Sequence, residues 1–194
     1  KGILRAFIPK GSRVLEIGCG TGDVLFALSP REGKGIDISE EMIALAKKRH
    51  AAHPELSFER VDLLAGSQDF PHDYLFMTDV LEHVRELPAF LDSVANGMAP
   101  GSRLIITLAN PRWEWLLMLT EKLGMKMPEG PHWRLSIKEN EALYRAAGLT
   151  IMEKGYRLLI PKQLPFSDWV NRRFYRSTFL APWSFIVYWV LVKP

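Results

Sequence analysis

Apolar runs rich in β-branched residues alternate with amphipathic segments along this chain. Each run is short and is followed by glycines, polar residues or a helical pattern, which indicates buried strands separated by helices. Five strands are predicted at residues 13–17, 33–38, 56–61, 74–78 and 103–108, and two further candidates lie at 149–160 and 184–192.

A first helix is predicted over residues 40–51. The hydroxyl of Ser39 can accept a hydrogen bond from one of the free backbone N–H groups at the start of this helix. The spacing of Met42, Leu45 and Ala46 predicts that they share its buried face, together with the aliphatic stem of an arginine one turn later.

Two later helices have stronger signals. The helix over 86–98 repeats apolar side chains at a spacing of about 3.6 residues, namely Leu87, Phe90, Leu91, Val94 and Met98. Ser136 and Glu139 form a capping box for a further helix, which ends at Gly148. The alternation of strands and helices predicts an α/β, doubly wound sheet.

In sheets of this class, ligands bind beyond the carboxyl ends of the strands, near the point where the strand order reverses. The chemistry is therefore expected directly after residues 17, 37, 61, 79 and 108.

The composition excludes several classes of protein. Of the 194 residues, 47% are hydrophobic and 24% charged, which excludes disorder, collagen-like sequence and a long coiled coil. The single cysteine, Cys19, excludes an internal disulfide and a cysteine-rich zinc site, and no metal is predicted.

The apolar stretch 179–192 is shorter than the roughly 20 residues of a spanning helix. No signal peptide is recognised, so a cytoplasmic location is expected.

The first strand is followed by a glycine-rich loop, Glu16-Ile-Gly-Cys-Gly-Thr-Gly-Asp23. Glycines let the backbone turn sharply and approach a ligand. A dinucleotide-binding fingerprint requires a glycine where this chain has Asp23, which disfavours a nicotinamide-dependent enzyme. The carboxylates at the two ends of the loop favour a cationic ligand over a pyrophosphate.

The segment from Val14 to Gly22 resembles motif I of the class I S-adenosylmethionine (SAM) dependent methyltransferases. The resemblance covers about residues 10–160. It implies a mostly parallel, seven-stranded, Rossmann-like sheet with an antiparallel last strand. It also implies SAM as the cofactor and S-adenosylhomocysteine as the product.

The resemblance also implies roles for residues at four strand ends. Asp37 would hold the ribose hydroxyls, and Asp62 the adenine amino group. Segment 78–84 would lie against the methionine end of SAM. The cofactor-binding set is then Glu16, Gly18, Cys19, Gly20, Asp37, Ile38, Asp62, Leu63, Asp79 and Val80, with Ile38 and Leu63 on the two faces of the adenine. The alternative is that the acids are ordinary cap and turn residues.

Two histidines are candidate general bases for methylation of a hydroxyl. His83, in Leu-Glu-His-Val, resembles the small-molecule and ubiquinone-biosynthesis-like branch of the family, as does the segment containing His132. Each histidine could instead orient a loop or cap a helix. Further candidates on the acceptor side are Glu82, Asn110 and Arg134. Histidines 50, 53 and 72 are predicted to lie at the surface without a function.

These observations predict a SAM-dependent methyltransferase that acts at an oxygen atom of a small-molecule acceptor or of a lipid- or carrier-linked acceptor. An N- or C-methyltransferase of the same fold stays open, as does a SAM-binding protein without transferase activity. The Asp79-Val-Leu-Glu sequence differs from the Asp/Asn-Pro-Pro-aromatic box of enzymes that methylate amino groups of nucleic-acid bases. A nucleic-acid substrate is therefore disfavoured.

Charge divides the chain unevenly. Residues 151–194 carry seven basic and two acidic side chains, whereas the first 150 residues have a net charge of −2. We expect one domain, 1–194, with insertions on the acceptor side near 111–131 and 161–182. The first would be an amphipathic lid or a helix packed at the sheet edge. The second, basic and aromatic, would contact an anionic substrate or a membrane surface, or be a solvated basic face. Because the chain begins at Lys1, we also expect a further natural N-terminal segment.

Overall fold

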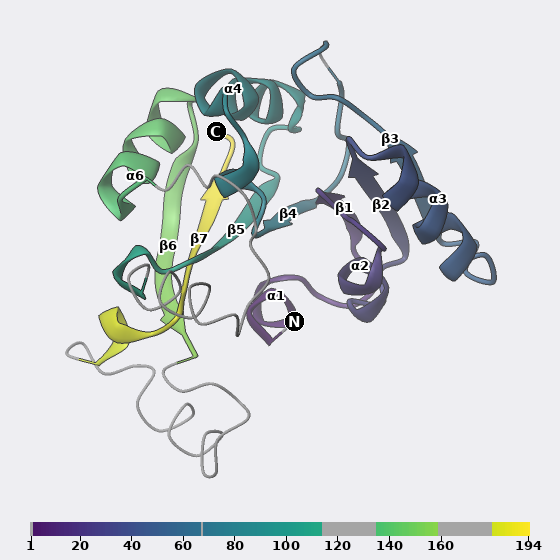
Figure 1. Cartoon of the computed structure of the whole chain (residues 1–194), viewed down its shortest axis with the longest axis horizontal. Coiled ribbons are helices and arrows are strands. Elements are labelled where there is room, and N and C mark those ends of the chain that lie inside the picture. The colour runs from purple at the N-terminus through teal and green to yellow at the C-terminus, as the bar shows by residue number, and fades with distance from the viewer. Residues whose placement is uncertain (1, 67, 114–134, 159–179) are drawn as a thin grey trace, which may run out of the picture.

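The computed structural model describes residues 2–66, 68–113, 135–158 and 180–194. A first βαβαβ half is followed by a second half that ends in two long strands (Figure 1). In chain order the elements are α1 (Gly2–Phe7), β1 (Arg13–Ile17), α2 (Asp23–Ala27), β2 (Glu32–Asp37), α3 (Glu40–Arg49), β3 (Leu56–Arg60), β4 (Tyr74–Thr78), η1 (Leu81–His83), α4 (Leu87–Gly97), β5 (Arg103–Ala109), η2 (Pro111–Trp113), α6 (Ile137–Ala146), β6 (Thr150–Arg157), η3 (Ala181–Trp183) and β7 (Ile186–Val192).

The strands form one seven-stranded sheet in the order β3-β2-β1-β4-β5-β7-β6. Every neighbouring pair from β3 to β5 is parallel, whereas β7 is antiparallel to both β5 and β6. The predicted mostly parallel sheet with an antiparallel last strand is therefore confirmed. The strand order reverses between β1 and β4, which places the switch point beside the glycine-rich loop.

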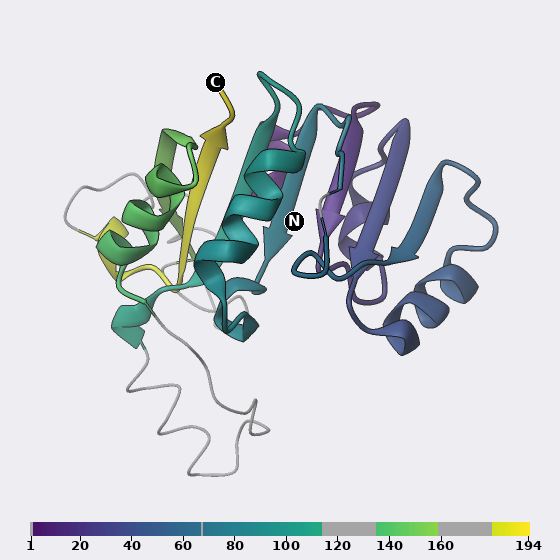
Figure 2. The same ribbon diagram turned by 90° about the horizontal axis from the view of Figure 1, so that it is seen from above.

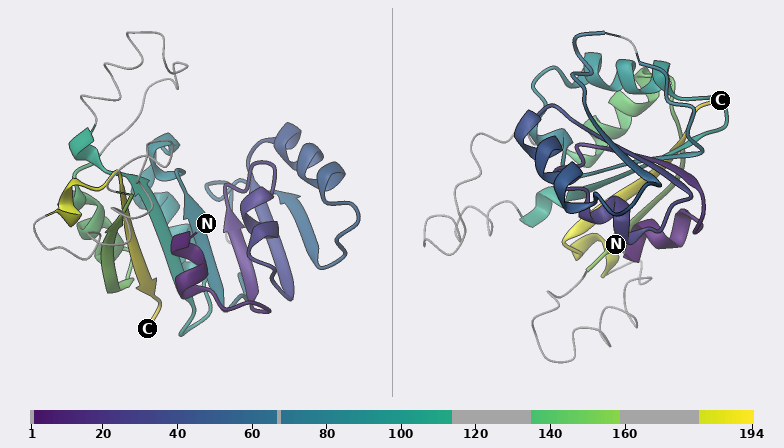
Figure 3. Two further views of the ribbon diagram at one scale, coloured as in Figure 1. Left: turned by 90° about the horizontal axis from the view of Figure 1, so that it is seen from below. Right: turned by 90° about the vertical axis from the view of Figure 1, so that its right-hand side faces the viewer.

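Helices cover both faces of the sheet, so that neighbouring residues of a strand enter different cores. Figure 2 shows α4 and α6 on one face, and the left view of Figure 3 shows α1, α2 and α3 on the other. In β1, Leu15 packs in the core beneath α4, and Val14 packs in the core with α1, α2 and α3. Strands buried on both faces explain the continuous apolar runs of the sequence.

The buried face of α3 differs from the prediction. Ile43 is 4% exposed and Ala46 is fully buried, whereas Leu45 is 44% exposed. The prediction was wrong for Leu45. Residues three and four apart share a helix face, and the face of α3 that packs on the sheet contains Ile43 and Ala46, so Leu45 points away from it. In α4, by contrast, the five apolar residues at helical spacing are all buried as predicted.

Two histidines predicted at the surface are buried. His50, the C-cap of α3, and His72 are each 6% exposed, and only His53 keeps a partly exposed side chain, at 37%. His50 follows Ile43 by seven residues and so continues the buried face of α3. The prediction failed because a polar residue at a helix end gives no apolar signal.

The C-terminal strand belongs to the sheet core. Val187, Trp189 and Leu191 pack on the α4 and α6 side, while Tyr188 and Val190 pack on the other. No helix within the described ranges is long and apolar enough to cross a membrane. Residues 114–134 and 159–179, which hold most of the two predicted insertions, lie outside the described residues.

Candidate functional site

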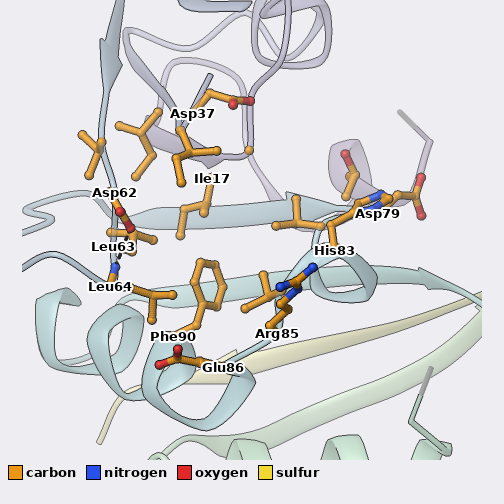
Figure 4. A pocket seen from close by; sticks show the side chains of 17 residues that line it. Ile17, Asp37, Asp62, Leu63, Leu64, Asp79, His83, Arg85, Glu86 and Phe90 are labelled. Atoms are coloured by element: carbon orange, nitrogen blue, oxygen red, sulfur yellow. Dashed lines mark hydrogen bonds between the residues drawn. The ribbon is translucent and has the colours of Figure 1, made fainter. Parts of the chain in front are cut away.

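A cavity of about 530 Å³ lies at the carboxyl ends of β1, β2, β3 and β4 (Figure 4). This volume is typical of sites for small molecules and cofactors. We call it the strand-end cavity, and its lining is Ile17, Gly18, Ile36, Asp37, Ile38, Val61, Asp62, Leu63, Leu64, Thr78, Asp79, Val80, His83, Val84, Arg85, Glu86 and Phe90.

The glycine-rich loop after β1 depends on backbone conformations that favour glycine. Gly18, Gly20 and Gly22 have φ values of 70°, 50° and 76°. A Cβ on Gly18 would lie 2.5 Å from Cγ2 of Val80, whereas a Cβ on Gly20 would meet no atom within 4 Å. Gly18 thus permits the close approach of the loop to the end of β4.

Asp37 joins the loop to the next helix. One carboxylate oxygen accepts the N–H of Gly20 at 2.9 Å and the other accepts the N–H of Ser39, also at 2.9 Å. Each carboxylate oxygen has more than one lone pair, so Asp37 can still accept hydrogen bonds from a ligand. The two backbone contacts fix its orientation at the rim of the strand-end cavity.

The segment after β3 contributes one acid and two apolar residues. An oxygen of Asp62 accepts the N–H of Leu64 at 2.9 Å. Leu63 is buried against the core, while Leu64 is 47% exposed and Ile38, from the end of β2, is 62% exposed. Large exposed apolar side chains on a cavity wall provide surface that a flat apolar ligand group would cover.

The end of β4 is conformationally strained. Asp79 has a φ of 55°, which is uncommon for a residue with a Cβ. Its N–H donates to the carbonyl oxygen of Thr107 at 3.1 Å, and the short helix η1 follows and brings the exposed His83 to the cavity. Strain of this kind is concentrated at functional sites.

Three predicted cofactor residues do not line the cavity: Glu16, Cys19 and Gly20. Glu16 is 2% exposed and accepts the N–H of Leu25 at 3.1 Å, near the start of α2. Burial raises its pKa to about 8, although the hydrogen bond from Leu25 acts in the opposite direction. Burial also raises the pKa of the Cys19 thiol to about 12, with the charges of Glu16 and Asp37 as smaller causes.

Of the acceptor-side candidates, Asn110 has a structural role. It is 1% exposed, and its amide nitrogen donates to the carbonyl oxygens of Pro182 and Ser184 at 3.0 and 2.7 Å. It therefore joins the end of β5 to the start of β7. Glu82 lines a separate small hollow between β5, α4 and α6. The other candidate base, His132, and Arg134 lie outside the described residues.

Several residues of the site were not predicted from the sequence. Nε2 of the buried His50 lies 3.1 Å from the carbonyl oxygen of Thr21, and its ring stacks on Phe58. Because a carbonyl only accepts, Nε2 carries the proton. Arg85 and Phe90 line the cavity from the segment after η1 and from α4. The helical pattern explains Phe90 as a core residue, and Arg85 stands in a turn without a motif.

Comparison with known proteins agrees with this geometry. The profile of the methyltransferase domain family matches residues 1–154. A ubiquinone biosynthesis O-methyltransferase of Neisseria meningitidis is 27% identical over 157 residues, 74% of this chain and 66% of that protein. The protein of the same name from Aeromonas salmonicida is 31% identical over 132 residues, 63% of this chain and 55% of that protein. The chain thus spans between half and two thirds of the length of these relatives.

Solved structures share the fold at low sequence identity. A SAM-dependent methyltransferase from Mesorhizobium loti aligns with a TM-score of 0.70 at 18% identity, over 99% of this chain and 96% of that one. A magnesium protoporphyrin IX methyltransferase from Synechocystis, with S-adenosylhomocysteine bound, aligns with a TM-score of 0.67 at 21% identity, over 100% of this chain and 80% of that one. The chain belongs to the methyltransferase domain family, among the class I SAM-dependent methyltransferases.

Proposed function

We propose that this protein transfers the methyl group of SAM to an oxygen atom of a small-molecule or a lipid- or carrier-linked acceptor. One observation carries the proposal. Seven of the ten residues selected from the sequence as cofactor ligands line a single cavity, although they come from four different strand ends. The curated relatives in the comparison are named O-methyltransferases, which supports oxygen as the acceptor atom.

The chemistry of the residues that line the strand-end cavity supports SAM as the ligand. Three carboxylates, those of Asp37, Asp62 and Asp79, line it and can accept hydrogen bonds from ribose hydroxyls and amino groups. Ile38 and Leu63 offer apolar surface for an adenine ring. SAM supplies a methyl group on a sulfonium centre, ready for in-line displacement. The protein would contribute alignment and exclusion of water.

His83 is our first candidate for the general base. It lies at the cavity on η1, and an imidazole exchanges protons near neutral pH. A hydroxyl acceptor must lose its proton during the transfer, so a base placed there would raise the rate. His132, selected from the sequence, is the second candidate. Acceptors methylated at nitrogen or carbon need not use such a base.

Transfer of label from methyl-labelled SAM into a metabolite and lipid extract tests this proposal. We expect His83→Gln to lower the rate about 100-fold or more, the usual scale for loss of a general base, with unchanged affinity for SAM. The matched control is His53→Gln, a half-exposed histidine beside Glu55, which should transfer at the wild-type rate.

Two results would separate the parts of the proposal. No transfer by the wild type to any acceptor contradicts the methyltransferase activity. Transfer by His83→Gln at the wild-type rate contradicts the role of His83 and favours His132 or an acceptor that needs no base. His132→Ala, measured alongside, distinguishes these two.

We further propose that the chain is one domain in which the basic segment 161–182 contacts an anionic membrane surface or substrate in the cytoplasm. The net positive charge of residues 151–194 supports this. So does the described part of that end, where Trp183 is 49% exposed and carries the guanidinium of Arg112 over its ring at 5.4 Å. Co-sedimentation with vesicles of anionic lipid, compared with neutral vesicles, tests the contact.

A further inference from the structure

The segment between η1 and α4 forms part of the wall of the strand-end cavity. Val84 has an extended backbone, with φ of −92° and ψ of 120°, and packs against the core beneath α4. In an extended segment, neighbouring side chains point to opposite sides. His83 and Arg85 therefore project to the same side of the chain across Val84, and all three residues line the strand-end cavity.

Of the described residues that line the strand-end cavity, Arg85 is the one lysine or arginine and therefore the one permanent cation. Its guanidinium forms no ion pair or hydrogen bond with any residue in the described ranges. Figure 4 shows it turned toward the middle of the drawn residues, near His83, while the carboxylate of Glu86 lies beyond Phe90. Among the described residues, the cavity thus contains a guanidinium without a direct ion-pair partner, next but one in sequence to the candidate base His83.

This charge is unexpected in a site for a cationic cofactor. The carboxylates of Asp37, Asp62 and Asp79 suit the positive groups of SAM, whereas a guanidinium would repel them. An arginine at a binding site is best explained by an anionic group, because its planar donors match carboxylate and phosphate oxygens. SAM itself carries one carboxylate, at its methionine end, so two anions are candidates, one on the cofactor and one on the acceptor. The position next to His83, the candidate base, favours the acceptor.

We propose that Arg85 selects acceptors that carry a carboxylate or phosphate near the oxygen to be methylated. The inference rests on the proposed function, because it names the substrate class of the same cavity. Arg85 would bind the anionic group and so hold the acceptor with its hydroxyl toward His83. It is a specificity residue and takes no part in proton transfer.

The test uses labelled SAM with a metabolite extract and follows the charge of the products. We expect the labelled product of the wild type to be retained on an anion exchanger at neutral pH. Arg85→Gln should lower the yield of this product at least about tenfold, the scale of a lost hydrogen bond to a charged group, with affinity for SAM within about twofold of the wild type. Arg85→Lys keeps the charge but loses the planar guanidinium, so its product yield should lie between those of the wild type and Arg85→Gln.

Arg103→Gln is the matched control, because it removes a guanidinium from the opposite edge of the sheet, beside His72 and Gly101. It should behave as the wild type. Treatment of the product with a phosphatase divides the candidate anions: loss of retention identifies a phosphate monoester, and unchanged retention identifies a carboxylate or a phosphate diester.

Three outcomes overturn the inference. A labelled product that passes through the anion exchanger shows a neutral acceptor. A marked loss of SAM affinity in Arg85→Gln assigns the guanidinium to the carboxylate of the cofactor instead. Unchanged yield in Arg85→Gln removes the residue from acceptor recognition. Failure of the wild type to transfer label at all contradicts the proposed function itself, and this inference falls with it.

Discussion

Burial separates the acids of the site into two chemical kinds. Asp37 is partly exposed and lines the cavity while it accepts two backbone N–H groups. Glu16 lies beneath the glycine-rich loop, 2% exposed, with a pKa raised to about 8 by burial. Asp37 is thus available as an acceptor for a ligand, while Glu16 serves the loop and the start of α2.

The raised pKa of Glu16 predicts how stability depends on pH. The unfolded chain releases this proton near pH 4.5, whereas the folded protein keeps it up to about pH 8. Between these values the folded state binds more protons, so the contribution of Glu16 to stability falls as pH rises. Glu16→Gln keeps an acceptor for Leu25 and removes the titration.

Urea unfolding between pH 5 and pH 8 measures this effect. We expect the wild type to lose stability relative to Glu16→Gln as pH rises, by more than about 1 kcal/mol over the range. Parallel curves for the two proteins across this range would contradict the assignment of a protonated, buried Glu16.

The strand-end rule predicted the positions of the site residues but could not orient all of them. Asp37 is the last residue of β2, and Asp62 and Asp79 follow β3 and β4 within two residues. The topology of a parallel sheet alone brings residues at such positions to one edge. Glu16 is still within β1, where side chains alternate between the two faces of the sheet. Its place on the α2 side depends on which face Leu15 and Ile17 occupy, and the glycine motif does not contain that information.

The glycine-rich loop is an element whose conformation and packing can be tested separately. In Gly18→Ala the new side chain would have to adopt a positive φ and would also clash with Val80. In Gly101→Ala, where φ is 79° and no atom lies within 4 Å of the added Cβ, only the backbone strain would remain. Gly101 lies at the opposite edge of the sheet, in the turn before β5.

We therefore expect Gly101→Ala to cost about 1–2 kcal/mol of stability, the scale of a strained left-handed residue, with normal SAM affinity. Gly18→Ala should cost more and should also weaken SAM binding at least about tenfold. Thermal unfolding and calorimetric titration measure both quantities. Equal losses in the two variants would show that Val80 does not constrain the loop.

The end of α3 supports the same loop through His50. In His50→Phe the ring can still pack against Phe58, but the carbonyl of Thr21 loses its donor. We expect the free energy of unfolding to fall by about 1–3 kcal/mol, the cost of an unpaired buried group. His53→Phe, at a half-exposed position, should change it by no more than about 0.5 kcal/mol. A smaller loss in His50→Phe than in His53→Phe would contradict this support.

Strands with continuous apolar runs were predicted well, whereas the short helix α1 was not. Strands β1 and β4 have the predicted bounds, Arg13–Ile17 and Tyr74–Thr78. The six-residue helix α1 was missed because it holds fewer than two turns, too few for a helical period to be recognised. His50 was missed because its buried state comes from the packing of α3 against the loop, which no local pattern encodes.

At the scale of the whole molecule, the acidic cavity and the basic C-terminal part have opposite charges. The acids of the site lie in the first 150 residues, whose net charge is −2, whereas residues 151–194 carry a net charge of +5. A cationic cofactor suits the first region and an anionic acceptor or surface suits the second. The sheet brings these regions together, because β6 and β7 from the basic part pair beside β5.

The central claim is that SAM binds at the carboxyl ends of the strands, with Asp37 as a ligand. Calorimetric titration of SAM into the wild type, Asp37→Ala and Asp73→Ala tests it most directly. Asp73 is an exposed acid at the opposite edge of the sheet, paired with Arg13 at 2.9 Å, so its loss matches the change in net charge. We predict binding by the wild type, affinity at least about tenfold weaker in Asp37→Ala, and a change within about twofold in Asp73→Ala. Equal affinities in all three proteins would contradict the account.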